Sequence, residues 1–355
     1  MLAVPIPAYG AYATLIATAF IISLIGCAVV QRSARRLRLV DVPNERSLHK
    51  APVPRLGGVA IVVTAWIVLG IGSLFVPIID HVDVLCWLSA ASLIALLGLI
   101  DDIRPLAAWV RLSVQLTVAA GFLAFVLRKG DLCLATGWRV PLSMSIMLGP
   151  AVVFVVGMTN IYNFMDGMDG LAATQSISAG LVLMVAATGA GQTDVAVIAS
   201  IVTAASAGFF LHNMPPATLF LGDAGSTFLG FTFGGLALIA ATRPSPVPIG
   251  VVPVAIAPFL LDGSFTILRR IRLGERIWQA HRSHLYQRAV ATGLTHRDVL
   301  LVYSAWCAVA AASAMRIAQS GISGACATAL AMIIPLVLVW RCVVRLEAKT
   351  TSGLH

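Results

Sequence analysis

The stretch NIYNFMDGMDGL, residues 160–171, lies between two apolar runs, Met147–Met158 and Ala172–Ala187. It places two asparagines, two aspartates and two glycines where a membrane-spanning helix is expected to end. Carboxylates at such a position are costly unless they face water, a cation or a partner. The stretch therefore predicts a polar site at one edge of a bundle of membrane helices.

The composition of the whole chain supports a membrane protein. Of its 355 residues, 59% are hydrophobic and only 11% are charged, whereas soluble domains have about 25% charged residues. We therefore expect an all-α polytopic membrane protein with one domain over residues 1–355 and a motif-bearing core at 41–290. In a soluble protein the net charge of +9 would suggest nucleic acid as a partner. The excess of positive charge in cytoplasmic loops explains it more simply, so no nucleic acid is expected.

Apolar runs of about 20 residues predict eleven membrane spans. The predicted spans are 11–30, 57–78, 84–100, 109–127, 144–162, 171–188, 195–212, 225–242, 247–268, 298–316 and 321–340. With the N-terminus outside, all but five of the 24 Lys and Arg residues lie in or beside cytoplasmic segments. The positive-inside rule thus predicts an outside N-terminus, a cytoplasmic C-terminus and an active site on the cytoplasmic face.

The first cytoplasmic loop, residues 41–58, reads DVPNERSLHKAPVPRLGG. Arg46 is a candidate bidentate donor to a phosphate, and Lys50 is a candidate point charge for the same group. The alternative is an ordinary positively charged loop with no ligand.

The next acidic feature is the pair Asp101–Asp102, which ends the run GLIDD. Adjacent carboxylates repel each other unless a cation or a hydrogen-bond donor intervenes. One of them could cap the following helix. A cap needs only one aspartate, so we interpret the pair as catalytic, with one member acting as a general base.

In the central stretch, Asn160, Asn163, Asp166 and Asp169 follow one another at intervals of three. On a helix this spacing lines one face, and hard oxygen ligands suit Mg²⁺. Gly167 allows the backbone to approach a ligand closely, which makes Gly167 and Asn160 candidates for substrate binding. The alternative is a polar helix end at the membrane interface.

Two further clusters follow in the sequence. Asp223, in the glycine-bounded turn FLGDAGS, is a candidate metal ligand, although a simple capping turn fits equally well. The basic loop that contains HRSHLYQR offers His281, Arg282 and His284 for phosphate or diphosphate binding. A zinc site there would need two more nitrogen or sulfur ligands, and a solvated amphipathic loop is the remaining alternative.

The order of these motifs carries a resemblance to a known family. D-x-P-N-x-R, H-K and P-x-x-G-G come first, followed by G-L-I-D-D, N-x-x-N-x-x-D-G-x-D-G-L, G-D-A-G-S and a histidine-containing basic loop. From Asp41 to Arg288 the chain resembles the polyprenyl-phosphate N-acetylhexosamine-1-phosphate transferases. The tail HRSHLYQR is similar to the bacterial branch that initiates O-antigen or other surface-polysaccharide synthesis.

The resemblance implies a reaction and its reagents. A UDP-activated amino sugar and undecaprenyl phosphate would give undecaprenyl-diphospho-sugar and UMP at the bacterial inner membrane. Mg²⁺ is the implied cofactor, with Mn²⁺ as the other candidate ion. The lipid phosphate, whose oxygens are already good nucleophiles, is expected to attack the donor directly. The oligomeric state is open, and a homodimer is compatible with such a bundle.

The resemblance also assigns roles by motif position. Asp101 and Asp102 match the acidic pair near the lipid phosphate, and Asp166 and Asp169 match catalytic or nucleotide-site aspartates. Asp223 matches the metal-ligand aspartate, with Asn163 as a second candidate oxygen ligand. The histidine pair and Lys50 match groups near the donor diphosphate and in the first loop, respectively.

The chain departs from the family pattern at two places. The sequence DDIRPL has no third acidic residue after the pair, and the histidine loop is reduced to H-R-S-H. Both departures disfavour the alternative of a peptidoglycan-type phospho-MurNAc-pentapeptide transferase. A cation-coupled transporter is a second alternative, but it would need acidic residues at mid-membrane and helices broken there. A structural or lipid-scaffold protein would leave the Asn/Asp/Gly cluster unexplained.

Overall fold

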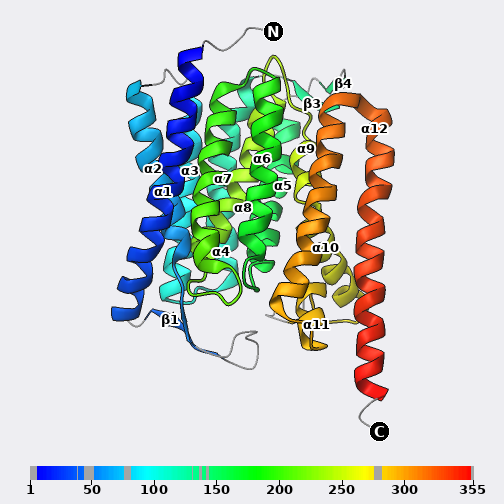
Figure 1. Cartoon of the computed structure of the whole chain (residues 1–355). Coiled ribbons are helices and arrows are strands. Elements are labelled where there is room, and N and C mark those ends of the chain that lie inside the picture. The colour runs from blue at the N-terminus through cyan, green and yellow to red at the C-terminus, as the bar shows by residue number, and fades with distance from the viewer. Residues whose placement is uncertain are drawn as a thin grey trace.

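A computed structural model gives the structure of the chain (Figure 1). The residues it describes are 6–37, 39–43, 52–75, 81–129, 131–135, 138–140, 144–275 and 282–352. Arg46, Lys50 and His281 lie outside the described residues.

Helices make up most of the described chain. They are α1 Ile6–Arg36, α2 Gly57–Phe75, α3 His81–Ile103, α4 Ala108–Val126, α5 Met144–Phe164, α6 Leu171–Gly189, α7 Thr193–Asn213, α8 Gly222–Ala241, α9 Val251–Ala255, α10 Ala257–Arg272, α11 Leu285–Ala291 and α12 His296–Ser352, with a short 3₁₀ helix Leu127–Lys129 after α4. Among the described residues, eight helices are long and apolar enough to cross a membrane: α1, α3 to α8, and α12 over its first part, His296–Gln319. The prediction of a polytopic helical membrane protein is confirmed, while the count of eleven spans and the orientation stay predictions.

Two short antiparallel strand pairs accompany the helices. Strands β1 Val40–Asp41 and β2 Val53–Pro54 pair with Val40 opposite Pro54, and β3 Leu132–Ala135 pairs with β4 Trp138–Val140. The two strand pairs lie at opposite ends of the bundle: Figure 1 shows β1 at the bottom and β3 and β4 at the top. The β1–β2 pair brings together the two described ends of the first loop.

Helix α8 is the centre of the bundle. Every residue of its most apolar 18-residue window is buried. Small residues allow its neighbours to come close: an added Cβ on Gly58 of α2 would lie 2.1 Å from the Cα of Gly225, and one on Gly98 of α3 would lie 2.4 Å from the main-chain oxygen of Asp223. Close backbone contact at small residues drives helix association in membranes, and here it fixes where α8 begins relative to α2 and α3.

The chain departs from the predicted single span at 247–268. The structure divides this region into the short helix α9 and the helix α10, with Ile256 between them. Pro258 lies in the first turn of α10, a position that proline tolerates well because its missing N–H has no intrahelical partner there. Prolines in the predicted span were the visible signal for this break.

Helix α12 doubles back on itself. A straight helix of its 57 residues would extend about 85 Å. In Figure 1 it instead rises in orange from the lower end of the bundle and descends again in red. Arg288 of α11 forms an ion pair with Glu347 near the end of α12 at 2.7 Å, so the beginning and end of α12 lie at the same end of the bundle.

Candidate active site

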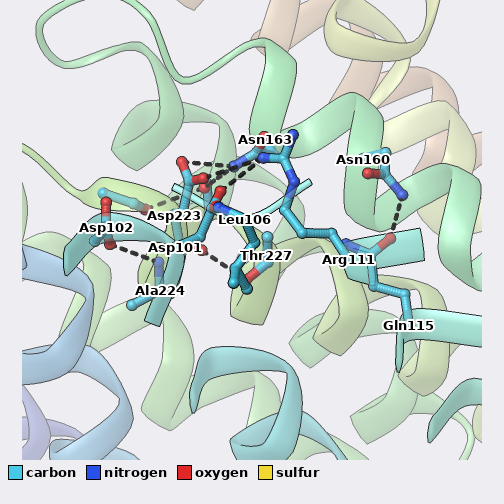
Figure 2. A network of polar contacts seen from close by, with 12 residues as sticks. Asp101, Asp102, Leu106, Arg111, Gln115, Asn160, Asn163, Asp223, Ala224 and Thr227 are labelled. Carbon is cyan, nitrogen blue, oxygen red and sulfur yellow. Dashed lines mark hydrogen bonds and ion pairs between the residues drawn. The ribbon is translucent and has the colours of Figure 1, made fainter. Parts of the chain in front are cut away.

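Three of the predicted polar clusters, those of Asp101–Asp102, Asn163 and Asp223, converge where α3 and α5 end and where α8 begins (Figure 2). The main-chain oxygens of Phe220 and Leu221, just before α8, accept hydrogen bonds from the N–H groups of Gly57 and Gly58 at 2.9 and 2.8 Å. These bonds join the first turn of α2 to the segment that carries Asp223. Residues far apart in the sequence are thereby held at one end of the bundle.

Asp102 is built into the start of α8. Its side chain is buried, and Oδ2 accepts the N–H of Ala224 at 3.1 Å. Gly222 has a φ of 77°, and an added Cβ there would lie 2.8 Å from Asp102 Oδ2. The guanidinium of Arg55 donates to the main-chain oxygen of Asp102. Glycine is therefore required at 222 both for the backbone conformation and for the close approach of this carboxylate.

Asp101 points to a different set of donors. Its Oδ1 accepts the N–H of Leu106 at 2.6 Å, and its Oδ2 accepts a hydrogen bond from Arg111 at 2.7 Å. The same Arg111 nitrogen lies 3.7 Å from Asp223 Oδ2. The residue that precedes α4 is Ala107, which makes no side-chain cap, so neither aspartate is the N-cap residue of the following helix.

Asp223 also contacts the central stretch. Nδ2 of Asn163 donates to Asp223 Oδ1 at 3.0 Å and to Ser226 Oγ at 2.9 Å. Figure 2 shows Asp101, Asp223 and Asn163 facing one another beside the guanidinium of Arg111. Since the amide nitrogen of Asn163 faces the aspartate, its oxygen would have to rotate toward Asp223 to share a metal ion with it.

Asp166 adds a further carboxyl group beside Asp223 and Asp102. Burial and the negative charges of Asp223 and Asp102 raise the pKa of Asp166 well above its ordinary value. A cation in this position would relieve the repulsion, so the chemistry of the donors fits a hard divalent ion. Among the described residues no group of three or more His, Cys, Asp or Glu side chains is arranged as a metal centre.

Two of the predicted side chains turn away from this group. Asn160 donates to Gln115 Oε1 of α4 at 2.6 Å and points away from the aspartates (Figure 2). Asp169 accepts the N–H of Ala217 at 3.0 Å and lies 3.1 Å from Nδ1 of His296. The interval of three along the chain does not align all four side chains, because α5 ends at Phe164 and the chain leaves the helix there.

The histidine loop is anchored by a buried carboxylate. Asp262, fully buried in α10, accepts the N–H groups of Leu285 and Tyr286 at 2.9 and 3.3 Å. His284 is also buried, with Nδ1 at 3.5 Å from Asp262 Oδ1, whereas Arg282 is exposed. Direct substrate contact by His284 stays a prediction, because in the structure its ring lies against Asp262.

Gly167 lies against this loop. An added Cβ on Gly167 would lie 2.2 Å from the hydroxyl oxygen of Tyr286. That hydroxyl also donates to the main-chain oxygen of Phe164 at 3.4 Å. The glycine therefore permits a close approach between the central stretch and α11. Its approach to a ligand stays a prediction.

Several residues of the site were not predicted from the sequence. They are Arg111, Gln115, Ser226, Tyr286 and His296, and of these Arg111 had the clearest signal. It is a charged residue inside a predicted apolar span, ten residues after Asp101, and such residues usually have a partner and a function.

Comparison with known proteins is consistent with this geometry. The family model described as glycosyl transferase family 4 matches residues 84–241. A probable undecaprenyl-phosphate N-acetylglucosaminyl 1-phosphate transferase of Bacillus subtilis is 33% identical over 81% of each chain. A decaprenyl-phosphate N-acetylglucosaminephosphotransferase of Mycobacterium tuberculosis is 29% identical over 83% of this chain and 79% of its own. An undecaprenyl-phosphate alpha-N-acetylglucosaminyl 1-phosphate transferase of Escherichia coli is 26% identical over 77% and 74%.

Proposed function

We propose that this chain, which belongs to the polyprenyl-phosphate N-acetylhexosamine-1-phosphate transferase family, transfers a sugar 1-phosphate from a UDP-activated amino sugar to undecaprenyl phosphate. The observation that carries the proposal is the convergence of Asp101, Asp102, Asp166 and Asp223 with Arg111 at one end of the bundle. Carboxylates can bind a cation and arginine can bind phosphate. Such a site suits a reaction between two phosphorylated substrates.

The balanced reaction forms one P–O bond and breaks another. An oxygen of the lipid phosphate attacks the phosphorus that carries the sugar, and the bond between the two phosphates of the donor breaks. The products are undecaprenyl-diphospho-sugar and UMP. Because the lipid phosphate is itself a good nucleophile, the proposal needs no covalent enzyme intermediate.

Asp223 would hold Mg²⁺, with the side-chain oxygen of Asn163 as its partner after rotation of the amide. When bound, the ion supplies positive charge that offsets the charge of the diphosphate and of the departing phosphate. Arg111 lies between Asp101 and Asp223, so its guanidinium can hold both carboxylates in place and contact a phosphate that enters the site.

Asp101 and Asp102 would act on the acceptor substrate, undecaprenyl phosphate. Asp102 is fixed by the N–H of Ala224, and Asp101 is fixed by Leu106 and Arg111. One of these fixed carboxylates can accept the proton of the lipid phosphate when that phosphate binds as the monoanion.

The finer identity of the substrates rests on the relatives. Their names specify N-acetylglucosaminyl phosphate transfer to undecaprenyl or decaprenyl phosphate, which supports an N-acetylated amino sugar and a polyprenyl phosphate here. We place the enzyme in the bacterial inner membrane and assign it to the initiation of O-antigen or another surface polysaccharide.

The test is UMP release by the detergent-purified chain across UDP-GlcNAc, UDP-GalNAc, UDP-FucNAc and UDP-QuiNAc. We expect UMP only when undecaprenyl phosphate and Mg²⁺ are both present, and loss of activity in EDTA that Mg²⁺ or Mn²⁺ restores. UDP-MurNAc-pentapeptide is included to test the peptidoglycan-type alternative. A monodisperse protein that releases no UMP from any donor would reject the proposal.

A further inference from the structure

A second polar cluster lies beside the aspartate group and centres on Asp169. Asp169 is buried, and its side chain has a relative exposure of 10%. Its Oδ2 accepts the N–H of Ala217 at 3.0 Å and lies 3.1 Å from Nδ1 of His296, the first residue of α12. Three segments that are distant in the sequence therefore meet at one carboxylate oxygen.

Neighbouring hydrogen bonds strengthen this junction. Asn213 at the end of α7 accepts the N–H of Gly170 at 2.9 Å and donates to the main-chain oxygen of Leu219 at 2.9 Å. Arg297, next to His296, donates to the main-chain oxygen of Pro215 at 3.3 and 3.4 Å. The segment 214–221 is thus held by the central stretch on one side and by the start of α12 on the other, and it leads directly to Asp223.

The start of α12 is itself well fixed. Oδ2 of Asp298 accepts hydrogen bonds from the N–H and the hydroxyl of Thr295 at 2.9 and 2.6 Å. These bonds join the residue before α12 to its first turn, so they fix the backbone from which His296 extends.

The two oxygens of Asp169 differ in their surroundings. Both contacts fall on Oδ2, and among the described residues no hydrogen bond or ion pair involves Oδ1. A carboxylate held at one oxygen by two donors cannot rotate freely, so its other oxygen is presented as an acceptor in a fixed direction. Fixed acceptors bind a substrate donor without the cost of reorganisation.

We propose that His296 is a positioning residue that orients the carboxylate of Asp169 and ties α12 to the segment leading to Asp223. The inference rests on the proposed function, since the role of Asp169 toward the substrates is part of it. With Nδ1 protonated, His296 donates a hydrogen bond to Asp169. In metal sites, residues outside the ligand shell orient the ligands by similar hydrogen bonds. Mutation of such a residue typically reduces activity about 10- to 100-fold.

The test compares kcat and KM for UMP release in His296→Leu, His296→Asn and wild type. The amide nitrogen of Asn replaces Nδ1 as the donor, whereas Leu removes the donor and keeps the bulk. We expect His296→Leu to lose about 10- to 100-fold in kcat/KM with its melting temperature retained. His296→Asn should recover most of the activity.

His212→Leu is the matched control, because Nε2 of His212 contacts the main-chain oxygen of Leu24. In the part of the chain that the structure describes, no carboxylate is paired with His212. It should leave kcat/KM unchanged. Wild-type kcat/KM in His296→Leu, or equal losses in His296→Leu and His296→Asn, would overturn the proposal, since a purely structural role would not distinguish them.

The design separates this inference from the proposed function. If the wild type releases no UMP, the proposed transferase reaction fails on its own. The contact between His296 and Asp169 is then tested by measuring the thermal stability of His296→Leu, Asp169→Asn and the double variant. Additive losses of stability would overturn the assignment, because residues in contact are expected to couple.

Discussion

Nδ2 of Asn163 donates to Oδ1 of Asp223 at 3.0 Å, across 60 positions of sequence. The bond joins the end of α5 to the first turn of α8. Arg111 approaches the other oxygen of the same aspartate at 3.7 Å. Asp223 is thus the point at which three helices meet, and its replacement is the first test of the site.

Asp223→Asn should leave the fold intact and remove most of the activity. The substitution keeps the shape of the side chain but removes the charge that would attract Mg²⁺. Loss of one group that stabilises developing charge costs about 10²- to 10³-fold in kcat, and we expect at least that in UMP release. The control is Asp131→Asn, an exposed aspartate directly before β3, the strand that Figure 1 places at the other end of the bundle from β1. This variant should retain full activity. Wild-type kcat in Asp223→Asn would contradict the metal assignment.

Arg111→Gln should reduce kcat/KM because Asp101 and Asp223 would lose the cation between them. Truncating one partner of a partly desolvated charge pair costs about 2–5 kcal/mol, and the exposure of Arg111 places the expected loss at the lower end, about 10- to 100-fold. Arg111→Lys keeps the charge but loses the planar, two-pronged geometry, so it should recover only part of the activity. Equal activity in the Gln and Lys variants would argue that the charge of Arg111 is not used.

Gly98→Ala should destabilise the protein and reduce activity together. The added methyl group would lie 2.4 Å from the main-chain oxygen of Asp223, so α3 and α8 would have to separate. Overpacking of this kind costs about 1–3 kcal/mol. Gly121→Ala in α4 is the matched control, because nothing lies within 4 Å of its added Cβ. It should be neutral or slightly stabilising in thermal unfolding, and comparable losses in both variants would refute the close-packing argument.

Asp166 should make the metal-free protein less stable as the pH rises. Its pKa in the folded state is raised above the ordinary value of 3.8 by burial and by Asp223 and Asp102. The folded chain therefore binds this proton more tightly than the unfolded chain does, and the free energy of unfolding falls as the pH rises from about 3.8 through the raised pKa.

Melting temperatures in EDTA, measured across this pH range, test the expectation. Asp166→Asn should show a weaker fall with pH than the wild type, and Asp131→Asn should follow the wild type. Mg²⁺ should stabilise the wild type most at the upper end of the range, since a ligand that binds only the folded state raises its stability. Identical pH profiles for wild type and Asp166→Asn would contradict the prediction.

The sequence predicted a polytopic bundle of membrane helices and a set of candidate site residues. Apolar runs and ionisable residues at their ends identify Asp101, Asp102, Asp166 and Asp223, which the structure places at one end of the bundle. Their chemical roles stay predictions. These residues can be identified from the sequence because an ionisable side chain in a membrane segment is energetically costly and usually has a function.

The orientation of individual side chains could not be predicted from spacing. The intervals between Asn160, Asn163, Asp166 and Asp169 suggested one shared face, but the chain leaves the helix after Phe164. Asp169 is consequently turned toward His296, and Asn160 toward Gln115. Contacts between segments separated by tens of residues decide these directions, and a local pattern contains no information about them.

Because α8 is enclosed by the other helices, changes in the bilayer are expected to have little effect on the position of the site. All residues of its most apolar window are buried, whereas only 22% of the corresponding window of α1 and 28% of that of α4 are buried. A thicker or thinner membrane acts first on such outer helices, which can tilt to match it. Asp223 stands at the start of a helix whose apolar window is enclosed by the rest of the protein, so the alignment of the aspartates is expected to tolerate variation in lipid chain length.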